Sequence, residues 1–381
     1  MKILFIQKMA GISGSEIYFM NILPELNKRG IPTEFCCVQH PGNSGKNEKF
    51  LQHLKNNNVT CHIINSRAPV SVPLIWKLKA LIRKEGYDIV QTNLIHADLW
   101  GALLRSFTSL PFKLVSVKHG YDEEFQKQFG FDHTRLKKDR FFRISKYANS
   151  KMDHAAAISE GLADLLVKGG LIPKEKIDVV HYGFDFKDKI PAADLSDYRY
   201  GYPQLIIVGR LIPVKQHSLV IQVLPVLKRK YPGLKLVLVG AGELEETLKK
   251  QVQEHGLGEA VLFAGFQSNI HDFIAASNLM LVPSSAEGFG VVILESWHNK
   301  IPVIAFDVPA PNEIIDNGIN GFLVKPFDMK DMEEKIEKLL EEPEQCQKMG
   351  EAGYLKLQQT FTMDVMVNKT IALYRKALQG K

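Results

Sequence analysis

Two permanent cations follow a predicted strand in the second half of the chain. The strand Leu205–Val208 leads into Gly209 and Arg210 and, after a turn shaped by Pro213, into Lys215. An arginine guanidinium can bind two phosphate oxygens at once, and a lysine adds a point charge. Surface cations are common and most are only solvated. Their position at a strand end nevertheless favours a site that binds phosphate oxygens.

Two carboxylates lie eight residues apart in a later connection from a strand to a helix. Glu287 is followed by Gly288, Phe289 and Gly290, and then by Glu295. If the helix begins near Gly290, both carboxylates can face one ligand, and the free amides at the helix start would bind a phosphate. A carboxylate also accepts hydrogen bonds from paired ribose or hexose hydroxyls. The alternative is a helix-capping Glu287 and a surface Glu295.

The first half of the chain has a glycine-rich loop after its first strand. Lys2–Gln7 is followed by Ala10–Glu16, which contains Gly11 and Gly14 and then enters a helix. Glycines let the backbone approach a ligand, and the amides at a helix start favour an anion. An ordinary strand-to-helix turn explains these residues equally well. The loop is not a Walker loop, because no Gly-Lys-Ser/Thr follows.

Two histidines lie at the carboxyl ends of predicted strands in the same half. His119 directly follows Lys113–Lys118, and His96 follows Asp88–Thr92. Ligands of open parallel sheets bind at these strand ends, so both side chains are candidates for a polar contact. For His96 we favour the interpretation as a polar wall residue, because histidines are often partly buried without a chemical role.

An alternating series of strands and helices must position these residues. Short aliphatic or β-branched runs alternate with longer amphipathic segments, which is typical of βαβ units. The strands expected in the first half are Lys2–Gln7, Thr33–Gln39, Thr60–Ile64, Asp88–Thr92, Lys113–Lys118 and His154–Ile158. Those expected in the second half are Leu205–Val208, Leu234–Val239, Val261–Ala264, Leu279–Val282, Val303–Ala305 and Gly321–Val324. We therefore predict an α/β fold of two Rossmann-like domains facing across a cleft.

The boundary between the two domains is expected where the periodic pattern lapses. This stretch runs from Phe184 to Pro203 and is interrupted by prolines and a glycine. The predicted domains are residues 1–190 and 191–381. The chain from Met329 onward is helical in pattern, and a last helix at about 362–378 can pack back on the first domain.

The positive charge of the chain is concentrated in one segment. The 381 residues include 48 Lys and Arg against 42 Asp and Glu, a net charge of +6 that is modest for a protein that coats nucleic acid. Residues 135–151 hold seven basic residues and one acidic residue, an excess equal to that net charge. With Phe141, Ile144 and Ala148 at helical spacing, the segment can dock on an anionic membrane surface or guide a lipid-phosphate acceptor. The alternative is a cation-rich helix packed on its sheet by one apolar face. No nucleic-acid partner is expected, because no reader motif is present.

Cysteine usage and hydropathy indicate a cellular setting. Cys36, Cys37, Cys61 and Cys346 form no Cys-x-x-Cys pair and no cluster with histidines, so we expect a reduced, cytoplasmic environment and no metal site. The apolar stretch at the amino terminus is too short for a signal peptide. No apolar run approaches the roughly 18 residues of a spanning helix. Any membrane contact is therefore expected to be peripheral, on the inner face.

Together, these motifs resemble those of the retaining glycosyltransferases of family 4, which have the GT-B fold of two Rossmann-like domains. The likeness is carried by a Glu-x7-Glu element that contains Glu-Gly-Phe-Gly and follows Gly-Arg-Leu-Ile-Pro-Val-Lys. It extends over nearly the whole chain. The other matching segments are the glycine-rich amino-terminal loop, His154–Glu160, Val239–Glu243, Phe263–Gly265 and Asn320–Phe322.

The resemblance implies roles for individual residues. Arg210 and Lys215 are implied to hold the diphosphate of a nucleotide-sugar donor, Glu295 the ribose and Glu287 the transferred sugar. His119 is implied to contact the donor phosphate or the reacting hydroxyl. The other implied donor-binding residues are Gly14, Gly209, Gly288, Phe289 and Gly290.

The sequence departs from the family pattern at two places. The family often has Glu-Ala-x-Ala-x-Gly after the second glutamate, whereas this chain has Trp297 and Lys300 in that stretch. A Gly-Gly pair often follows the next strand, where this chain has Val308–Pro311 with Pro309 and Pro311. The prolines remove amide donors near the expected sugar site. The sequence therefore leaves the identity of the donor sugar open.

The resemblance implies a retaining transfer of a sugar from a nucleotide diphosphate sugar to a hydroxyl of a saccharide or lipid-linked acceptor, in surface polysaccharide or glycolipid synthesis. The first domain would be the acceptor side and the second the donor side. No cofactor or metal is expected, because fixed cations and helix-end amides can stabilise the leaving diphosphate. Two alternatives stay open: a non-catalytic sugar-nucleotide-binding protein, and a nicotinamide-dependent oxidoreductase. The second is disfavoured because the loop at Gly11 lacks the Gly-x-Gly-x-x-Gly spacing.

Overall fold

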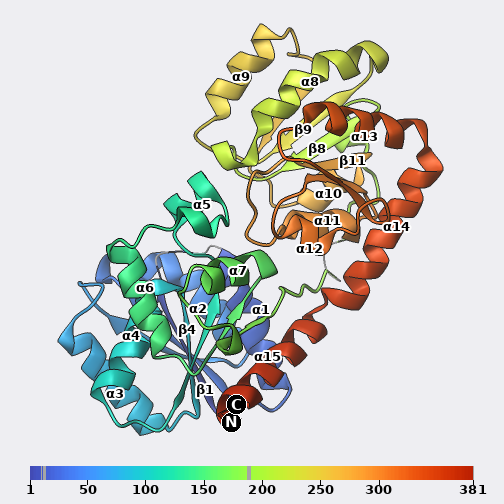
Figure 1. The fold of residues 1–381 in the computed structure, drawn as a ribbon. Helices are drawn as coiled ribbons and strands as arrows, with labels where there is room; N and C mark the ends of the chain where they lie inside the picture. The colour runs from blue at the N-terminus through green and yellow to red at the C-terminus, as the bar shows by residue number, and fades with distance from the viewer. Residues whose placement is uncertain (10, 12–13, 187–189, 381) are drawn as a thin grey trace. The chain divides into compact units, whose positions relative to one another are not determined.

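The computed structural model describes residues 1–9, 11, 14–186 and 190–380, which form two compact units (Figure 1). Unit 1 contains Met1–Asp122, Phe131–Phe184 and Met363–Lys381, and unit 2 contains Glu123–Gly130 and Asp185–Thr362. The chain thus enters unit 2 a few residues before the expected boundary at 190. Residues 123–130 belong to unit 2 although they precede this boundary, and residues 363–381 belong to unit 1 although they follow it. Of the predicted linker 184–203, residues 187–189 lie outside the described residues.

Unit 1 is built around a seven-stranded parallel sheet in the order β3-β2-β1-β4-β5-β6-β7. Its strands are β1 (Ile3–Met9), β2 (Thr33–Gln39), β3 (Thr60–Asn65), β4 (Ile89–Asn93), β5 (Lys113–Lys118), β6 (His154–Ala157) and β7 (Ile177–Val179). The six strands that the sequence predicts are confirmed. The seventh, β7, was not predicted, because three residues are too few to show a period.

Helices pack on both faces of this sheet. The helices and 3-10 turns of unit 1 are α1 (Gly14–Lys28), η1 (Pro41–Asn47), α2 (Glu48–Asn56), α3 (Val72–Glu85), α4 (Leu94–Phe107), η2 (His133–Arg135), α6 (Arg140–Ser150), α7 (Glu160–Lys168), η3 (Lys174–Lys176) and α15 (Met363–Gln379). Phe5 of β1 packs edge-to-face on Phe19 of α1, with the ring centroids 5.9 Å apart. Leu4 and Ile6 point to the opposite face and join the apolar cluster with α3 and α4. Alternate residues of one strand therefore serve two helical layers.

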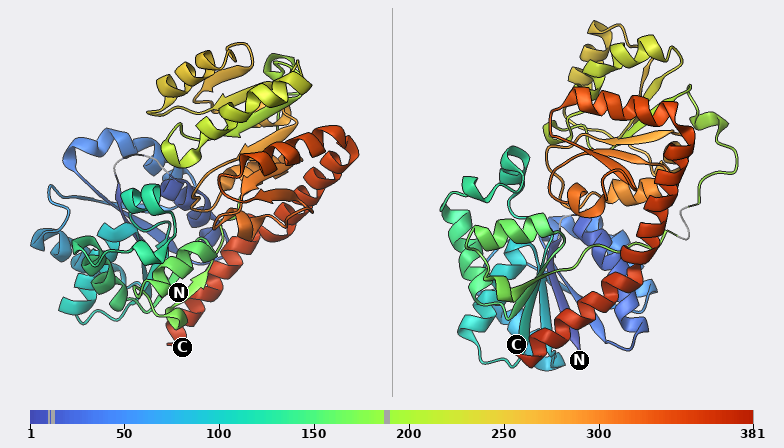
Figure 2. Two further views of the ribbon diagram at one scale, coloured as in Figure 1. Left: turned by 45° about the horizontal axis from the view of Figure 1, so that its top comes forward. Right: turned by 45° about the vertical axis from the view of Figure 1, so that its right-hand side comes forward.

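The last described helix, α15, belongs to unit 1. It lies against α1, β5 and β6 (Figure 2). Tyr374 is fully buried in this packing, and Lys376 Nζ lies 2.8 Å from a carboxylate oxygen of Asp178 in β7. The carboxyl end of the chain therefore helps to build the core of the amino-terminal fold.

Unit 2 has a six-stranded parallel sheet in the order β10-β9-β8-β11-β12-β13. Its strands are β8 (Gln204–Val208), β9 (Lys235–Val239), β10 (Val261–Gly265), β11 (Leu279–Val282), β12 (Val303–Phe306) and β13 (Gly321–Val324). All six strands predicted for the second half are confirmed. Two Rossmann-like parallel sheets are therefore present, as the α/β fold class requires.

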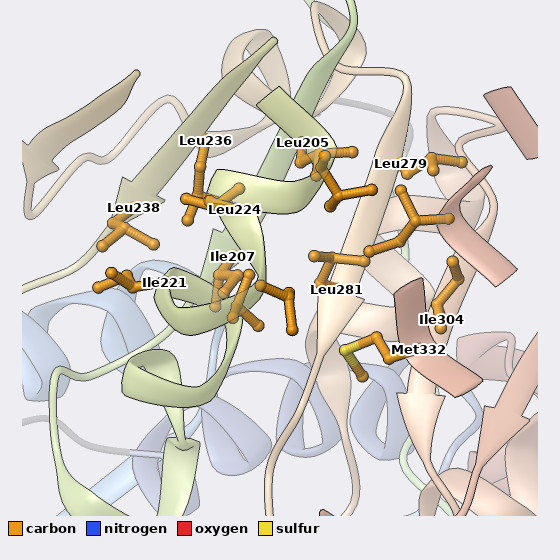
Figure 3. Packing of buried hydrophobic residues seen from close by; sticks show 14 of the residues in the cluster. Leu205, Ile207, Ile221, Leu224, Leu236, Leu238, Leu279, Leu281, Ile304 and Met332 are labelled. Carbon is orange, nitrogen blue, oxygen red and sulfur yellow. The ribbon is translucent and has the colours of Figure 1, made fainter. Parts of the chain in front are cut away.

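The helices of unit 2 enclose a continuous apolar core. They are α5 (Glu123–Phe129), η4 (Ser196–Tyr198), η5 (Pro213–Lys215), α8 (His217–Lys230), α9 (Glu245–Glu254), α10 (Ile270–Ala275), α11 (Val291–His298), α12 (Pro311–Ile314), α13 (Met329–Glu341) and α14 (Pro343–Thr360). Figure 3 shows alternate residues of β8, β9 and β11 meeting α8 and Met332 of α13. This apolar packing holds in place the strands that are followed by the predicted site residues.

The basic segment 135–151 contains the helix α6, which packs on α4. The buried face of α6 consists of Phe142, Ser145, Ala148 and Asn149. The predicted apolar stripe was wrong in its rotation, because only Ala148 of its three members is fully buried, and Phe141 packs on Tyr121 instead. The basic residues of the segment are all exposed: Arg135, Lys137, Lys138, Arg140, Arg143, Lys146 and Lys151. In the part of the chain that the structure describes, no helix has the length and apolar character to cross a membrane.

Candidate functional site

The strand order of unit 2 reverses direction between β8 and β11. From β8 the chain continues to β9 and β10 on one side, whereas β11, β12 and β13 are added on the other side. Ligands of open parallel sheets bind outside the carboxyl ends of the strands at such a point. Arg210 and Lys215 follow β8, and Glu287 follows β11, so the topology brings these three predicted residues to one edge of the sheet.

The loop after β8 holds its two cations in different environments. Gly209 has φ +154°, and a Cβ atom there would lie 3.5 Å from Cε of Lys215. The lysine stem therefore runs past the glycine, and its side chain is only 18% exposed. Arg210 is exposed. One cation is thus held in a fixed position, and the other lies at the surface of the loop.

Lys215 and Glu287 form an ion pair between the two loops. Nζ of the lysine lies 2.5 Å from Oε1 of the glutamate, whose side chain is 9% exposed. The loops are also joined through the backbone, because the Ser285 amide donates to the Val214 carbonyl at 2.9 Å. Glu287 therefore does not have the helix-capping role considered above. Its carboxylate instead fixes the position of the lysine ammonium group.

The helix α11 begins where the sequence predicts. Gly290 is its N-cap residue with φ +85°, and a glycine has no side chain with which to cap the helix. Its first amides are therefore available to a ligand in the way that helix starts allow. Glu295 lies in the second turn and is half-buried. The Phe289 ring is buried and packs edge-to-face on Phe361, so the phenylalanine can offer a ligand only its backbone.

The glycines of Val239–Glu243 lock the loop after β9 onto the loop after β8. A Cβ atom at Gly240 would lie 2.0 Å from the Gly209 carbonyl oxygen, and one at Gly242 would lie 2.3 Å from the Leu211 carbonyl oxygen. The Leu211 amide donates to the Ala241 carbonyl at 3.1 Å. Only residues without a side chain permit this approach, so these glycines support the loop that carries Arg210 and Lys215.

In unit 1, His119 lies at the carboxyl end of β5 with both ring nitrogens in hydrogen bonds. Asn93 Nδ2 donates to Nε2, and Nδ1 is paired with the Tyr182 hydroxyl. Tyr182 stacks on the imidazole ring with the centroids 5.8 Å apart. Burial, with a smaller contribution from the Lys118 charge, lowers the pKa of His119 to about 3. The histidine is therefore a neutral group at this strand end.

His96 and Gly14 are the other two candidate residues that the sequence predicts in unit 1. His96 lies in the first turn of α4, with Nε2 3.4 Å from Lys8 Nζ, and burial and this lysine lower its pKa. Gly14 begins α1, but residues 10 and 12–13 of the predicted glycine-rich loop lie outside the described residues. In the described ranges, no three His, Cys, Asp or Glu side chains are grouped as metal ligands would be.

The sequence did not predict a role for two residues that hold the His119 ring, or for one helix beside the loops of unit 2. Asn93 and Tyr182 hold the His119 ring, and Asn93 could have been noted because it follows a predicted strand directly. The helix is α5, which lies against η5 within unit 2. A Cβ atom at Gly130, just after α5, would lie 3.1 Å from Ala286 Cβ. No local signal places this segment beside loops so distant in sequence.

Two family models match separate halves of the chain. The model described as Glycosyltransferase Family 4 matches residues 12–188, and the model described as Glycosyl transferases group 1 matches residues 197–356. The two matches follow the division of the chain into two parallel sheets. Together they cover most of the sequence.

Curated relatives and a solved structure extend this comparison. The putative glycosyltransferase EpsD of Bacillus subtilis is 28% identical over 75% of this chain and 76% of that protein. The UDP-Gal:α-D-GlcNAc-diphosphoundecaprenol α-1,3-galactosyltransferase of Escherichia coli is 25% identical over 68% of this chain and 69% of its own. The crystal structure of Anabaena HepE in complex with UDP has a TM-score of 0.81 and 22% identity, and covers 98% of this chain and 99% of its own.

The predicted GT-B fold is confirmed by this structural likeness over nearly the full length of both chains. A fold alone hosts many activities, but the family models carry the sequence patterns of both halves. The chain therefore belongs to the family 4 glycosyltransferases and is a glycosyltransferase.

Proposed function

We propose that this glycosyltransferase moves a sugar from a nucleotide diphosphate sugar to an acceptor hydroxyl with retention at the anomeric carbon. The observation that carries the proposal is the Lys215–Glu287 ion pair at the carboxyl ends of neighbouring strands, with Arg210 in the same loop. HepE, which shares the fold, has been crystallised with UDP and with UDP-glucose, and this supports a uridine nucleotide as the first donor to test.

The cations act on the leaving group. As the bond from the sugar to the diphosphate breaks, negative charge grows on the diphosphate oxygens. Arg210 can contact two of these oxygens, and Lys215 and the first amides of α11 supply further positive potential. Lys215 is held in place before the reaction begins, because Glu287 and the glycine-supported loop fix its side chain. The lysine can therefore stabilise the charge without reorganising.

The carboxylates act on the sugar side. Glu295 in the second turn of α11 is assigned to the ribose hydroxyls, and Glu287 to hydroxyls of the transferred sugar. The Glu287 carboxylate also offsets positive charge that grows on the sugar ring. Because Glu287 binds Lys215 at the same time, it links the leaving-group cation to the reacting sugar. In this mechanism the leaving phosphate receives the acceptor proton on the same face of the sugar.

We assign the acceptor to saccharides or lipid-linked saccharides of surface polysaccharide or glycolipid synthesis. The relative from Escherichia coli has a name that states a diphosphoundecaprenol-linked acceptor, and a relative from Staphylococcus aureus is a capsular polysaccharide biosynthesis glycosyltransferase. The chemistry shared by these acceptors is a sugar hydroxyl, in one case joined to a lipid diphosphate.

A donor screen followed by matched substitutions tests this function. UDP-, ADP- and GDP-sugars are first compared by thermal shift, because a bound ligand raises the apparent stability. Transfer is then measured for Arg210→Ala and Lys215→Ala at saturating donor. Removal of one group that stabilises the developing charge should lower kcat on the order of 100-fold.

Two exposed cations of unit 2, Arg229 and Lys250, provide matched controls. Their alanine variants should transfer at the parental rate. A parental rate for Lys215→Ala would contradict the leaving-group assignment. Donor binding without transfer to any of a broad panel of acceptors would instead favour a non-catalytic sugar-nucleotide-binding protein.

We further propose that the exposed cations of segment 135–151 hold the enzyme on an anionic membrane, near a lipid-linked acceptor. All seven are exposed, and each Lys or Arg near an anionic surface contributes about 1 kcal/mol. Parental protein should float with phosphatidylglycerol vesicles but not with phosphatidylcholine vesicles. The change of Lys137, Lys138, Arg140 and Arg143 to Gln should abolish flotation.

The matched control removes four exposed lysines of unit 2, namely Lys250, Lys325, Lys330 and Lys348. This control variant carries the same change in net charge and should float like the parent. Equal flotation of the two variants would show that the segment does not determine membrane binding.

A further inference from the structure

A chain of buried hydrogen bonds runs from the last helix to His119. The Tyr374 hydroxyl of α15 donates to Gln91 Oε1 at 2.5 Å, and Gln91 Nε2 donates to Asn93 Oδ1 at 3.2 Å. Asn93 Nδ2 then donates to His119 Nε2. Gln91, Asn93 and Tyr374 are all fully buried. All of these contacts lie within unit 1.

The direction of this chain sets the state of the imidazole. An amide nitrogen can only donate, so His119 Nε2 must be the acceptor and carries no proton. A neutral imidazole then has its proton on Nδ1, which donates to the Tyr182 oxygen. Each amide is oriented by its neighbour, since Asn93 Oδ1 receives the Gln91 amide and Gln91 Oε1 receives the Tyr374 hydroxyl.

We propose that Tyr374, Gln91 and Asn93 are positioning residues that hold the His119 ring at the end of β5 with Nδ1 protonated and Nε2 unprotonated. The inference rests on the proposed function in one respect, namely that His119 is a residue of the reaction site. It assigns α15, which lies more than 200 residues further along the chain, to the support of that site. Because both ring nitrogens are already bound, His119 does not act as a general base.

The surroundings of the ring favour the neutral form. Tyr18 of α1 contacts the imidazole edge-to-face with the centroids 5.1 Å apart, and Tyr182 stacks on it. Burial raises the pKa of both phenols, so they remain uncharged. The charge that lowers the pKa of His119 further is that of Lys118, whose ammonium group binds Asp98 at 2.6 Å. Among the described residues, no carboxylate raises the pKa of His119, so none compensates an imidazolium charge.

The decisive measurement is the protonation of each ring nitrogen by nitrogen NMR of the histidines of the full chain. The His119 signals are assigned by their loss in His119→Gln. The parent should show the tautomer with the proton on Nδ1, and the ring should stay neutral from pH 8 to pH 5. A proton on Nε2 in the parent would overturn the proposal without the need for any other variant.

Substitutions along the chain test whether these residues cause the tautomer. In Asn93→Asp the carboxylate can accept a hydrogen bond from a protonated Nε2, so His119 should gain a positive charge and titrate within the measured range. The pH profile of transfer should gain the same ionisation. Tyr374→Phe removes the donor to Gln91 Oε1 and weakens the orientation of the Gln91 amide, which Tyr18 also contacts, so a minor population of the second tautomer should appear. Its kcat should fall about tenfold, because small displacements in a reaction site can cost up to 100-fold.

The matched control is Tyr87→Phe, which also removes a buried phenol hydrogen bond of unit 1, from Tyr87 to Glu34 at 2.6 Å. It should leave the tautomer and the pH profile as in the parent. An unchanged tautomer and titration in Asn93→Asp would overturn the proposal. If the tautomer shifts as expected while His119→Gln transfers at the parental rate, the positioning chain stands and the assigned role of His119 in the reaction is wrong.

Discussion

The Lys215–Glu287 pair joins two residues that are 72 positions apart in the sequence. Both side chains are largely buried, so a change of one partner leaves the other charge in a partly desolvated place. The effects of the two single substitutions will therefore not add up to the effect of the double substitution, because the two side chains interact directly. The consequence for interpretation is that Glu287 variants report on the leaving group as well as on the sugar.

Ala310 has a backbone conformation that alanine rarely adopts. Its φ and ψ are +79° and −63°, it is fully buried, and its amide donates to Glu313 Oε1 at 3.2 Å. The family often has a glycine pair in this stretch. Such backbone strain costs about 1–3 kcal/mol, whereas glycine adds up to about 1 kcal/mol of entropy cost. Ala310→Gly should therefore raise the free energy of unfolding by about 1 kcal/mol in urea titrations.

The control for this change is Ala276→Gly at the end of α10, where the backbone is in the ordinary right-handed helical region. This variant should lower the stability by up to about 1 kcal/mol, because no strain is relieved. If Ala310→Gly lowers the stability as much as the control does, the backbone of Ala310 is not strained.

At the scale of elements, the unusual sequence after Glu295 is explained by the packing of α11 on α14. Trp297 is fully buried, and its Nε1 donates to the Asn320 carbonyl at 3.0 Å. The helix α14 presents Gly350 and Gly353, where Cβ atoms would lie 1.9 Å from the Lys300 carbonyl oxygen and 2.3 Å from Trp297 Cδ1. The departure from the family pattern is therefore matched by small residues on a neighbouring helix.

This packing predicts an inverted response to a common stabilising change. In a helix interior, Gly→Ala usually stabilises by up to about 1 kcal/mol. At Gly353 the added methyl group meets a rigid, buried indole, so the free energy of unfolding should fall by about 2 kcal/mol. Urea unfolding measures the loss.

A double substitution separates this clash from other causes. In a Trp297→Leu background the smaller side chain makes room, so Gly353→Ala should lose most of its effect. Equal effects of Gly353→Ala in both backgrounds would show that α11 and α14 do not interact through this contact.

For the molecule as a whole, buried neutral histidines make stability depend on pH. His217, the first residue of α8, is 2% exposed, and among the described atoms neither ring nitrogen has a hydrogen-bond partner. Burial, with a smaller effect of Lys215, lowers its pKa to about 4, from 6.5 in the unfolded chain. Below pH 6.5 the unfolded state binds the proton and the folded state does not, so stability falls as the pH falls.

The expected loss is up to about 1.4 kcal/mol per pH unit for each such histidine between pH 6.5 and the folded pKa. Urea unfolding from pH 7 to pH 5 measures this slope. His217→Leu should reduce the slope by the share of one histidine and should not lower the stability at pH 7. His255→Leu, at an exposed position, is the control and should leave the slope unchanged. Equal slopes for the parent and His217→Leu would contradict the assignment.

The structural predictions that depend only on local sequence pattern are confirmed most fully. Twelve of the strands were predicted, because alternating apolar runs report which faces are buried. The start of α11 near Gly290 followed from its glycines. The short strand β7 and the rotation of α6 were not predicted correctly. Three residues carry too little pattern, and the buried face of α6 depends on its partner helix α4.

The sequence by itself determined the order of the elements, the two sheets and the family. It also identified three candidate site residues in loops, namely Arg210, Lys215 and Glu287. Each of these depends on neighbours within a few residues or on motifs that can be read along the chain. The tertiary structure alone decided that Glu287 binds Lys215, that segment 123–130 joins unit 2, and that Tyr374 reaches His119 through Gln91 and Asn93. These contacts join residues that are far apart in sequence, and their partners are selected by strand order and side-chain packing, which no local pattern encodes.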